Sequence, residues 1–159
     1  MSTHVSRAHA AMADVPLQPL EWTIASDVLA INMVVESVVR LSAASGFSAR
    51  HCRFNIPIAL TEALANAILR GNRNDLSRKV QIRSAVMLTR DGATLHVDVT
   101  DEGDGFDIES AGCTPDAPDW FEREDGRGVF LMRSLMDRVE CTCTAGLPGS
   151  TVRLILHRA

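Results

Sequence analysis

The segment VQIRSAVMLTRDGATLHVDVTDEGDG, residues 80–105, holds the clearest structural pattern in the chain. Apolar residues alternate with polar ones on both sides of the Asp-Gly pair at 91–92, as is typical of strands with one buried face. Asp-Gly also favours the tight turn of a β-hairpin. We therefore predict an antiparallel hairpin of residues 80–89 and 94–100, followed directly by the acidic, glycine-rich stretch DEGDG.

Helical patterns lie on both sides of this hairpin. Before it, apolar residues recur at helical spacing from Ser26, a plausible N-cap, to Gly46, a plausible stop. A second helix is expected from about Ala49 to Leu69, and Pro57 suggests a break or a late start in it. After the hairpin comes a loop of about 20 residues, long enough to act as a functional lid. The amphipathic helix GVFLMRSLMDRV and two strands, VECTCTA and TVRLILH, close the chain.

This order of elements predicts the α+β class. Strands joined by hairpins imply a mostly antiparallel sheet, and three helices must cover one face of it, which gives a two-layer α/β sandwich. The length of 159 residues suits one domain. We place that domain at residues 21–159 and expect residues 1–20 to form a loosely structured N-terminal tail.

The composition argues against several classes of protein. The net charge is −4, from 20 acidic and 16 basic residues, whereas proteins devoted to nucleic acid usually carry a basic face. No apolar run approaches the roughly 20 residues of a membrane span, and the N-terminus lacks the apolar centre of a signal peptide. We therefore expect a cytoplasmic protein. Cys141 and Cys143 share one strand face, either as small buried hydrophobes or as a metal-binding pair.

The segment TEALANAILRGN contains the first group of residues suited to chemistry. Glu62, Asn66 and Arg70 are four residues apart and therefore share one helix face. A carboxylate there can accept a proton from a hydroxyl group or water, and an amide oxygen suits Mg²⁺. An ordinary solvated helix face is the alternative interpretation.

The stretch DEGDG contains the second group. Gly103 and Gly105 lack side chains, so the backbone can approach a ligand closely there. Asp101 can accept a hydrogen bond from an amino group, and the exocyclic amine of a purine suits this carboxylate better than a phosphate would. A glycine-rich turn without a ligand is the alternative.

The third group is Gly126, Arg127 and Gly128, which we expect to precede a helix. The amides at a helix N-terminus and an arginine together form a natural site for an anion. A turn without a ligand is again the alternative.

Taken in order, these motifs resemble those of the ATPase superfamily shared by gyrase, histidine kinases and MutL, the GHKL superfamily. EALAN resembles its N box, DEGDG its first glycine box and GRGVFL its second. Within the superfamily, TEALANAILRGN and GRGVFLMRSLMDRVE are typical of the bacterial anti-sigma factor serine/threonine kinases. The resemblance covers roughly residues 24–157.

The resemblance implies a Bergerat fold, in which ATP lies between the sheet, the helices and a lid. It implies that Glu62 activates the attacking hydroxyl, that Asn66 binds Mg²⁺ and that Asp101 anchors adenine. It also implies that Gly103 and Gly105 shape the adenine pocket and that Thr151 lies near adenine. The residues implied to meet the phosphates are Gly126, Arg127 and Gly128. Arg70 stands where this group often has histidine, and it is a candidate phosphate contact.

The function implied is that of a protein kinase that phosphorylates a small anti-anti-sigma protein of the STAS type and sequesters a sigma factor by partner switching. A homodimer is also implied, without direct contact to nucleic acid or membrane. Alternatives are a nucleotide-binding regulatory module that acts without phosphotransfer, a standalone ATPase and a detached histidine kinase domain.

Overall fold

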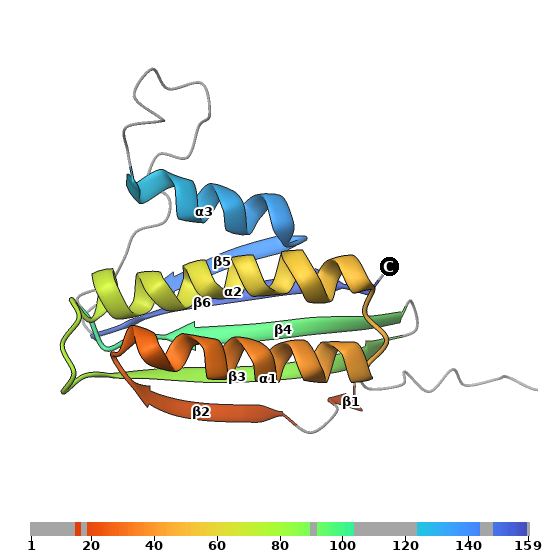
Figure 1. Cartoon of the computed structure of the whole chain (residues 1–159), viewed down its shortest axis with the longest axis horizontal. Helices are drawn as coiled ribbons and strands as arrows, with labels where there is room; N and C mark the ends of the chain where they lie inside the picture. Colours follow the sequence, from red (N-terminus) through yellow and green to blue (C-terminus); the bar gives the residue numbers. More distant parts are fainter. Residues whose placement is uncertain (1–14, 17–18, 90–91, 104–123, 144–147, 159) are drawn as a thin grey trace, which may run out of the picture.

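The computed structural model describes residues 15–16, 19–89, 92–103, 124–143 and 148–158. They form a six-stranded antiparallel sheet with helices on one of its faces (Figure 1). The strand order is β1-β3-β4-β6-β5, and β2 also pairs with β3. The strands are β1 (Val15–Pro16), β2 (Leu20–Ala25), β3 (Lys79–Thr89), β4 (Gly92–Thr100), β5 (Arg138–Cys143) and β6 (Ser150–His157).

The α+β class and the two-layer sandwich are therefore confirmed. The helices are the 3-10 turn η1 (Val28–Ala30), α1 (Ile31–Ala44), the π-helical segments η2 (His51–Asn55) and η3 (Asn66–Gly71), α2 (Ile56–Ala65) and α3 (Glu124–Leu135). Segments η2, α2 and η3 follow one another without a break and form one helical run. Pro57 lies in the first turn of α2, just where the run changes from the π-helical η2 to the α-helical α2, and the helical run continues through it.

The predicted hairpin is confirmed as β3 and β4. Ile82 pairs with Val99 and Val86 with Leu95, and all four side chains are buried against the helices. The Asp-Gly turn itself lies only partly within the described residues, but Gly92 has φ 136°, a conformation that favours glycine. Alternation along β3 and β4 thus produces one apolar face, which drives the helices onto that side of the sheet.

Two details at the N-terminal end correct the sequence-based predictions. The side chain that caps the first helical turn belongs to Asp27, which accepts a hydrogen bond from the Leu29 N–H at 2.9 Å. Ser26 is instead buried and donates its hydroxyl to the Arg78 carbonyl oxygen at 3.0 Å. The strand β2 was not predicted, and β1 lies within the range expected to be a loose tail; the rest of that range up to residue 14 lies outside the described residues.

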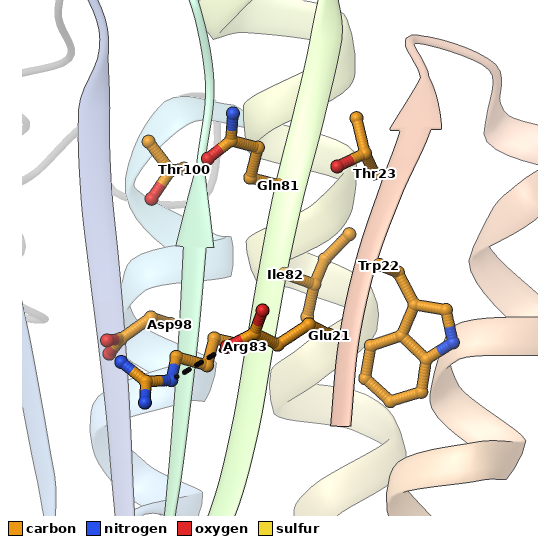
Figure 2. A pocket seen from close by; sticks show the side chains of 8 residues that line it. All are labelled: Glu21, Trp22, Thr23, Gln81, Ile82, Arg83, Asp98 and Thr100. Atoms are coloured by element: carbon orange, nitrogen blue, oxygen red, sulfur yellow. Dashed lines mark ion pairs between the residues drawn. The ribbon is translucent and has the colours of Figure 1, made fainter. Parts of the chain in front are cut away.

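The face of the sheet opposite the helices is polar and contains hollows. Figure 2 looks onto this face at a hollow of about 260 Å³ between β2, β3 and β4. The charged side chains that line it already pair with neighbours: Arg83 Nε lies 3.2 Å from Glu21 Oε1, and Asp98 accepts two hydrogen bonds from Arg153 at 2.7 and 2.8 Å. This hollow lies on the other side of the sheet from the buried carboxylate of Asp101.

The cysteines follow the predicted alternation only in part. Cys141 is half-buried, but Cys143 is exposed, so the expectation of two buried hydrophobes is wrong for Cys143. In the part of the chain that the structure describes, no group of three His, Cys, Asp or Glu side chains could hold a metal ion. Within the same residues, every helix is too short or too polar to span a bilayer.

Candidate functional site

Asp101 occupies a buried position immediately after β4. Its side chain is anchored on both oxygens: Gly103 donates its N–H to Oδ1 at 2.8 Å, and the Ser150 hydroxyl donates to Oδ2 at 2.7 Å. The Asp101 N–H donates to the Ser150 carbonyl oxygen at 3.0 Å. With 5 % of its surface exposed, Asp101 is oriented by the protein, and each carboxylate oxygen keeps acceptor capacity beyond the one hydrogen bond that it accepts here.

Glycines surround this carboxylate because side chains would not fit. A Cβ atom on Gly71 would lie 2.5 Å from Asp101 Cγ, and one on Gly103 would overlap the Gly71 carbonyl oxygen. Gly149 has φ 97°, and a Cβ atom there would overlap the Asp101 carbonyl oxygen. The end of the helical run, the turn after β4 and the start of β6 therefore meet at one point. Gly103 is placed there as predicted, whereas Gly105 lies outside the described residues.

Glu62 and Asn66 form the other end of the site. They lie one turn apart at the junction of α2 and η3, and both are half-buried. Gly128 of α3 faces them: a Cβ atom there would lie 2.6 Å from Glu62 Oε2 and 3.7 Å from Asn66 Nδ2. Helix α3 therefore packs closely on α2 at this glycine (Figure 1). The structure thus brings together two groups that are more than 60 positions apart in the sequence.

The second Gly-x-Gly does not precede its helix, as the sequence suggested, but lies inside it. Gly126 and Gly128 both belong to α3, which begins at Glu124, and Arg127 between them is exposed. Glycine disfavours helix interiors, which is why the pattern predicted a later start; packing against α2 outweighs that preference. Arg70 is half-buried in η3, one turn beyond Asn66.

Thr151 requires a correction. Its hydroxyl lies 2.8 Å from that of Thr100, on the sheet face away from the helices. Ser150, its neighbour in β6, points the other way and reaches Asp101. Because side chains alternate along a strand, these two adjacent hydroxyl groups cannot share a face. Of the two, it is therefore Ser150 and not Thr151 that the structure places against Asp101. The spacing from the buried residues Val152 and Leu154 could have identified Ser150.

The two ends of the site are joined by the helical run. Gly71, which touches Asp101, lies nine residues after Glu62. That is at most about 13.5 Å along the run, the length if every residue had the α-helical rise. One end offers a buried carboxylate for a hydrogen-bond donor. The other offers a carboxylate and an amide beside the first turns of α3, where backbone N–H groups favour an anion. The arrangement suits an elongated ligand with an amino group at one end and a negatively charged group at the other.

This architecture and this site define an ATP-binding domain of the histidine kinase-like type. The family model for the histidine kinase-like ATPase domain matches residues 24–156, and the chain belongs to that family.

Among proteins of known function, the chain is similar to the serine-protein kinase RsbW of Bacillus licheniformis, with 31% identity over 106 residues that cover 64% of each chain. It is 34% identical to RsbW of Bacillus subtilis over 98 residues, which cover 58% of this chain and 59% of that protein. It is also 32% identical to the anti-sigma F factor of Anoxybacillus flavithermus over 103 residues, 64% of this chain and 67% of that one. The chain thus spans less than two thirds of the length of the two RsbW relatives.

A solved structure supports the fold. The crystal structure of the RsbU and RsbW domains of a Mycobacterium tuberculosis protein aligns with a TM-score of 0.60 and 20% identity, over 89% of this chain and 33% of that one.

Proposed function

We propose that this chain is an ATP-dependent serine/threonine protein kinase that phosphorylates an anti-anti-sigma protein of the STAS type and binds a sigma factor. The observation that carries the proposal is the position of Glu62 and Asn66 beside Gly128, at the opposite end of one helical run from the anchored carboxylate of Asp101. The names of the relatives, serine-protein kinase and anti-sigma factor, agree with it.

Asp101 recognises the adenine end in this proposal. Its carboxylate accepts a hydrogen bond from the exocyclic amine, and Gly103 and Gly105 leave room for the base. Ser150 takes the place that the sequence assigned to Thr151, because its hydroxyl holds Asp101 Oδ2. A buried carboxylate with fixed oxygens discriminates strongly between an amine and a carbonyl group on the bound base. A carbonyl oxygen opposite the carboxylate would bring two acceptors together, and neither would receive a hydrogen bond.

Glu62 acts at the phosphate end as the general base. It accepts the proton of the partner's serine or threonine hydroxyl while the γ-phosphoryl group passes from ATP to that oxygen and ADP is released. Gly126, Arg127 and Gly128 at the start of α3, with Arg70, contact the phosphates. The fit to Mg²⁺ is good, because this ion commonly uses one or two protein oxygen ligands together with phosphates. Asn66 would supply such a ligand, and the ion would offset phosphate charge.

Phosphorylation then changes the choice of partner. It adds about −1.5 to −2 charges to the anti-anti-sigma protein, which weakens its contact with this chain and leaves the chain able to hold the sigma factor. A homodimer and a cytoplasmic location belong to the same proposal.

The test uses purified protein, labelled ATP, Mg²⁺ and the small anti-anti-sigma protein encoded near its gene. Glu62→Gln keeps the size of the side chain but removes the base, so phosphotransfer should fall by at least about 100-fold. Glu36→Gln is the matched control, because Glu36 lies on the exposed face of α1, with its side chain 71% exposed and 3.7 Å from Arg40.

Equal transfer by the wild-type protein and Glu62→Gln would refute the role of Glu62. Tight ATP binding without label on the partner would instead favour a regulatory module that only binds nucleotide. Release of inorganic phosphate at the same rate with and without the partner would favour a standalone ATPase.

A further inference from the structure

Asn72 follows the helical run directly and is completely buried. Both N–H bonds and the oxygen of its side-chain amide take part in hydrogen bonds. Nδ2 donates to Ser26 Oγ at 2.7 Å and to the Lys79 carbonyl oxygen at 2.9 Å, while Oδ1 accepts from the Glu102 N–H at 2.8 Å. One side chain therefore joins the end of β2, the start of β3 and the turn that follows β4.

Only a primary amide can make this set of contacts at this position. The two acceptors, Ser26 Oγ and the Lys79 carbonyl, need two donors, and the Glu102 N–H needs an acceptor. The Ser26 hydroxyl already donates to the Arg78 carbonyl oxygen at 3.0 Å, so it receives rather than gives a hydrogen bond at Asn72. An aspartate side chain at this position would place a carboxylate oxygen against Ser26 Oγ and the Lys79 carbonyl oxygen, with no proton to donate to either.

The contacts of Asn72 bear directly on Asp101. The N–H that donates to Asn72 Oδ1 belongs to Glu102, the residue directly after Asp101. On its other side, Asn72 follows Gly71, which packs against the Asp101 carboxylate. A second hydrogen bond, from the Lys79 N–H to Glu102 Oε2 at 2.7 Å, holds the same turn. On the opposite side, Ser150 holds Asp101 through its hydroxyl and its carbonyl oxygen.

We propose that Asn72 is a positioning residue for Asp101 and thereby sets the preference of the site for a 6-amino purine over a 6-oxo purine. The inference rests on the proposed role of Asp101 toward adenine. Without the Asn72 amide, the Glu102 N–H and the Lys79 carbonyl lose their buried partner, and the peptide between Asp101 and Glu102 loses one of the hydrogen bonds that fix its orientation. The contacts from Ser150, Gly103 and Lys79 remain, so Asp101 stays near its place but meets the amine of the base with less well-defined distance and angle.

The test compares the binding of ATP with that of inosine triphosphate, which carries a carbonyl oxygen where ATP carries the amine. Wild-type protein should prefer ATP, and Asp101→Asn should lose that preference. Asn72→Ala should lower the ratio of ATP affinity to inosine triphosphate affinity by roughly tenfold, the order expected for the loss of a well-aligned buried hydrogen bond. Isothermal titration calorimetry measures both affinities on each protein.

The matched control is Asn55→Ala. Asn55 is another asparagine that donates to a backbone carbonyl, that of Leu135 at 2.7 Å. It is half-buried rather than fully buried, and its contact joins η2 to α3 and does not reach Asp101. It should lower the melting temperature without changing the affinity ratio. If Asn72→Ala does not fold by circular dichroism, Ser26→Ala replaces it, because it removes one acceptor of the same amide and should shift the ratio in the same direction.

The outcomes separate the inference from the proposed function. An equal loss of affinity for both nucleotides in Asn72→Ala, with the wild-type ratio kept, would mean that Asn72 only supports the fold and would overturn the inference alone. A wild-type protein without any preference for ATP would overturn the role of Asp101, and the inference with it.

Discussion

Replacing Gly128 with alanine tests the geometry at Glu62 most directly. The added Cβ atom would lie 2.6 Å from Glu62 Oε2 and 3.6 Å from Glu62 Cδ. Since non-bonded heavy atoms make contact at about 3.5 Å, the carboxylate must retreat by roughly 1 Å. A displacement of about 1 Å in a reacting group can lower a rate by on the order of 100-fold. We therefore expect phosphotransfer to the anti-anti-sigma partner to fall by about that factor.

The same substitution should change stability little. Alanine is favoured over glycine in a helix interior by about 1 kcal/mol, whereas moving one flexible side chain off its preferred rotamer costs about 0.5–1.5 kcal/mol. These two effects are opposed, so the free energy of unfolding should stay within about 1 kcal/mol of the wild-type value. Asn66 should keep its position, because the Cβ atom would be at an ordinary contact distance of 3.7 Å from Asn66 Nδ2. ATP affinity is measured separately from the rate, because Gly128 is also proposed to contact the phosphates.

The assay measures initial rates of label transfer at saturating ATP, together with thermal unfolding and ATP titration of each variant. Ser134→Ala is the control on the same helix: Ser134 is exposed and donates only to the Phe130 carbonyl oxygen at 2.8 Å. Its rate should match the wild-type rate. A folded Gly128→Ala protein that transfers phosphate at the wild-type rate would refute the reasoning, because Glu62 would then not need the position that the structure gives it.

Two further predictions concern the strand that carries Ser150 and the polar face of the sheet. Ser150→Ala removes the donor to Asp101 Oδ2, so it should destabilise the fold by about 1–3 kcal/mol and weaken ATP binding in a titration. Thr151→Val should leave ATP affinity unchanged. A stronger effect of Thr151→Val than of Ser150→Ala would contradict the assignment of strand faces. Burial, and then the nearby charge of Arg153, lower the pKa of His96 below its ordinary value. The unfolded chain therefore takes up this proton more readily than the folded protein does, and stability should fall as the pH drops below about 6.5. Thermal unfolding between pH 7.5 and 5.5 should show a smaller decrease for His96→Gln than for the wild-type protein, and identical pH dependence would count against this contribution of His96.

Local patterns predicted the central hairpin because the information needed is local. The alternation of apolar residues in β3 and β4 and the Asp-Gly pair between them specify the pairing without reference to the rest of the chain. The strand β2 shows the limit of such patterns. Leu20, Trp22 and Ile24 alternate with polar residues as well, but the strand forms only by pairing with Lys79–Ser84, about 60 residues later in the chain. A segment of six residues next to Pro19 carries too weak a signal for that distant pairing.

The sequence also indicated most of the candidate site, but not its geometry. Glu62, Asn66, Asp101 and the second Gly-x-Gly could be selected because their spacing and chemistry suit a nucleotide. Which hydroxyl of β6 meets Asp101 was decided by the face of the strand, and a choice shifted by one residue selects the opposite face. Likewise, the glycines of α3 fall within the helix because Gly128 allows α2 and α3 to approach closely, whereas helix propensity alone favours a later start.

By itself, then, the sequence determined most of the elements and their order, the apolar face of the sheet and the chemical groups available for an amine and for phosphates, but not β1 and β2. The periodicity of side chains is enough for the elements and for the apolar face, and the residue types alone supply the chemical groups. Only the tertiary structure decided that Gly71, Asn72 and Ser150 converge on Asp101 and that Gly128 faces Glu62. These contacts join segments far apart in the chain, and they depend on strand register and on the space left where a glycine has no Cβ atom.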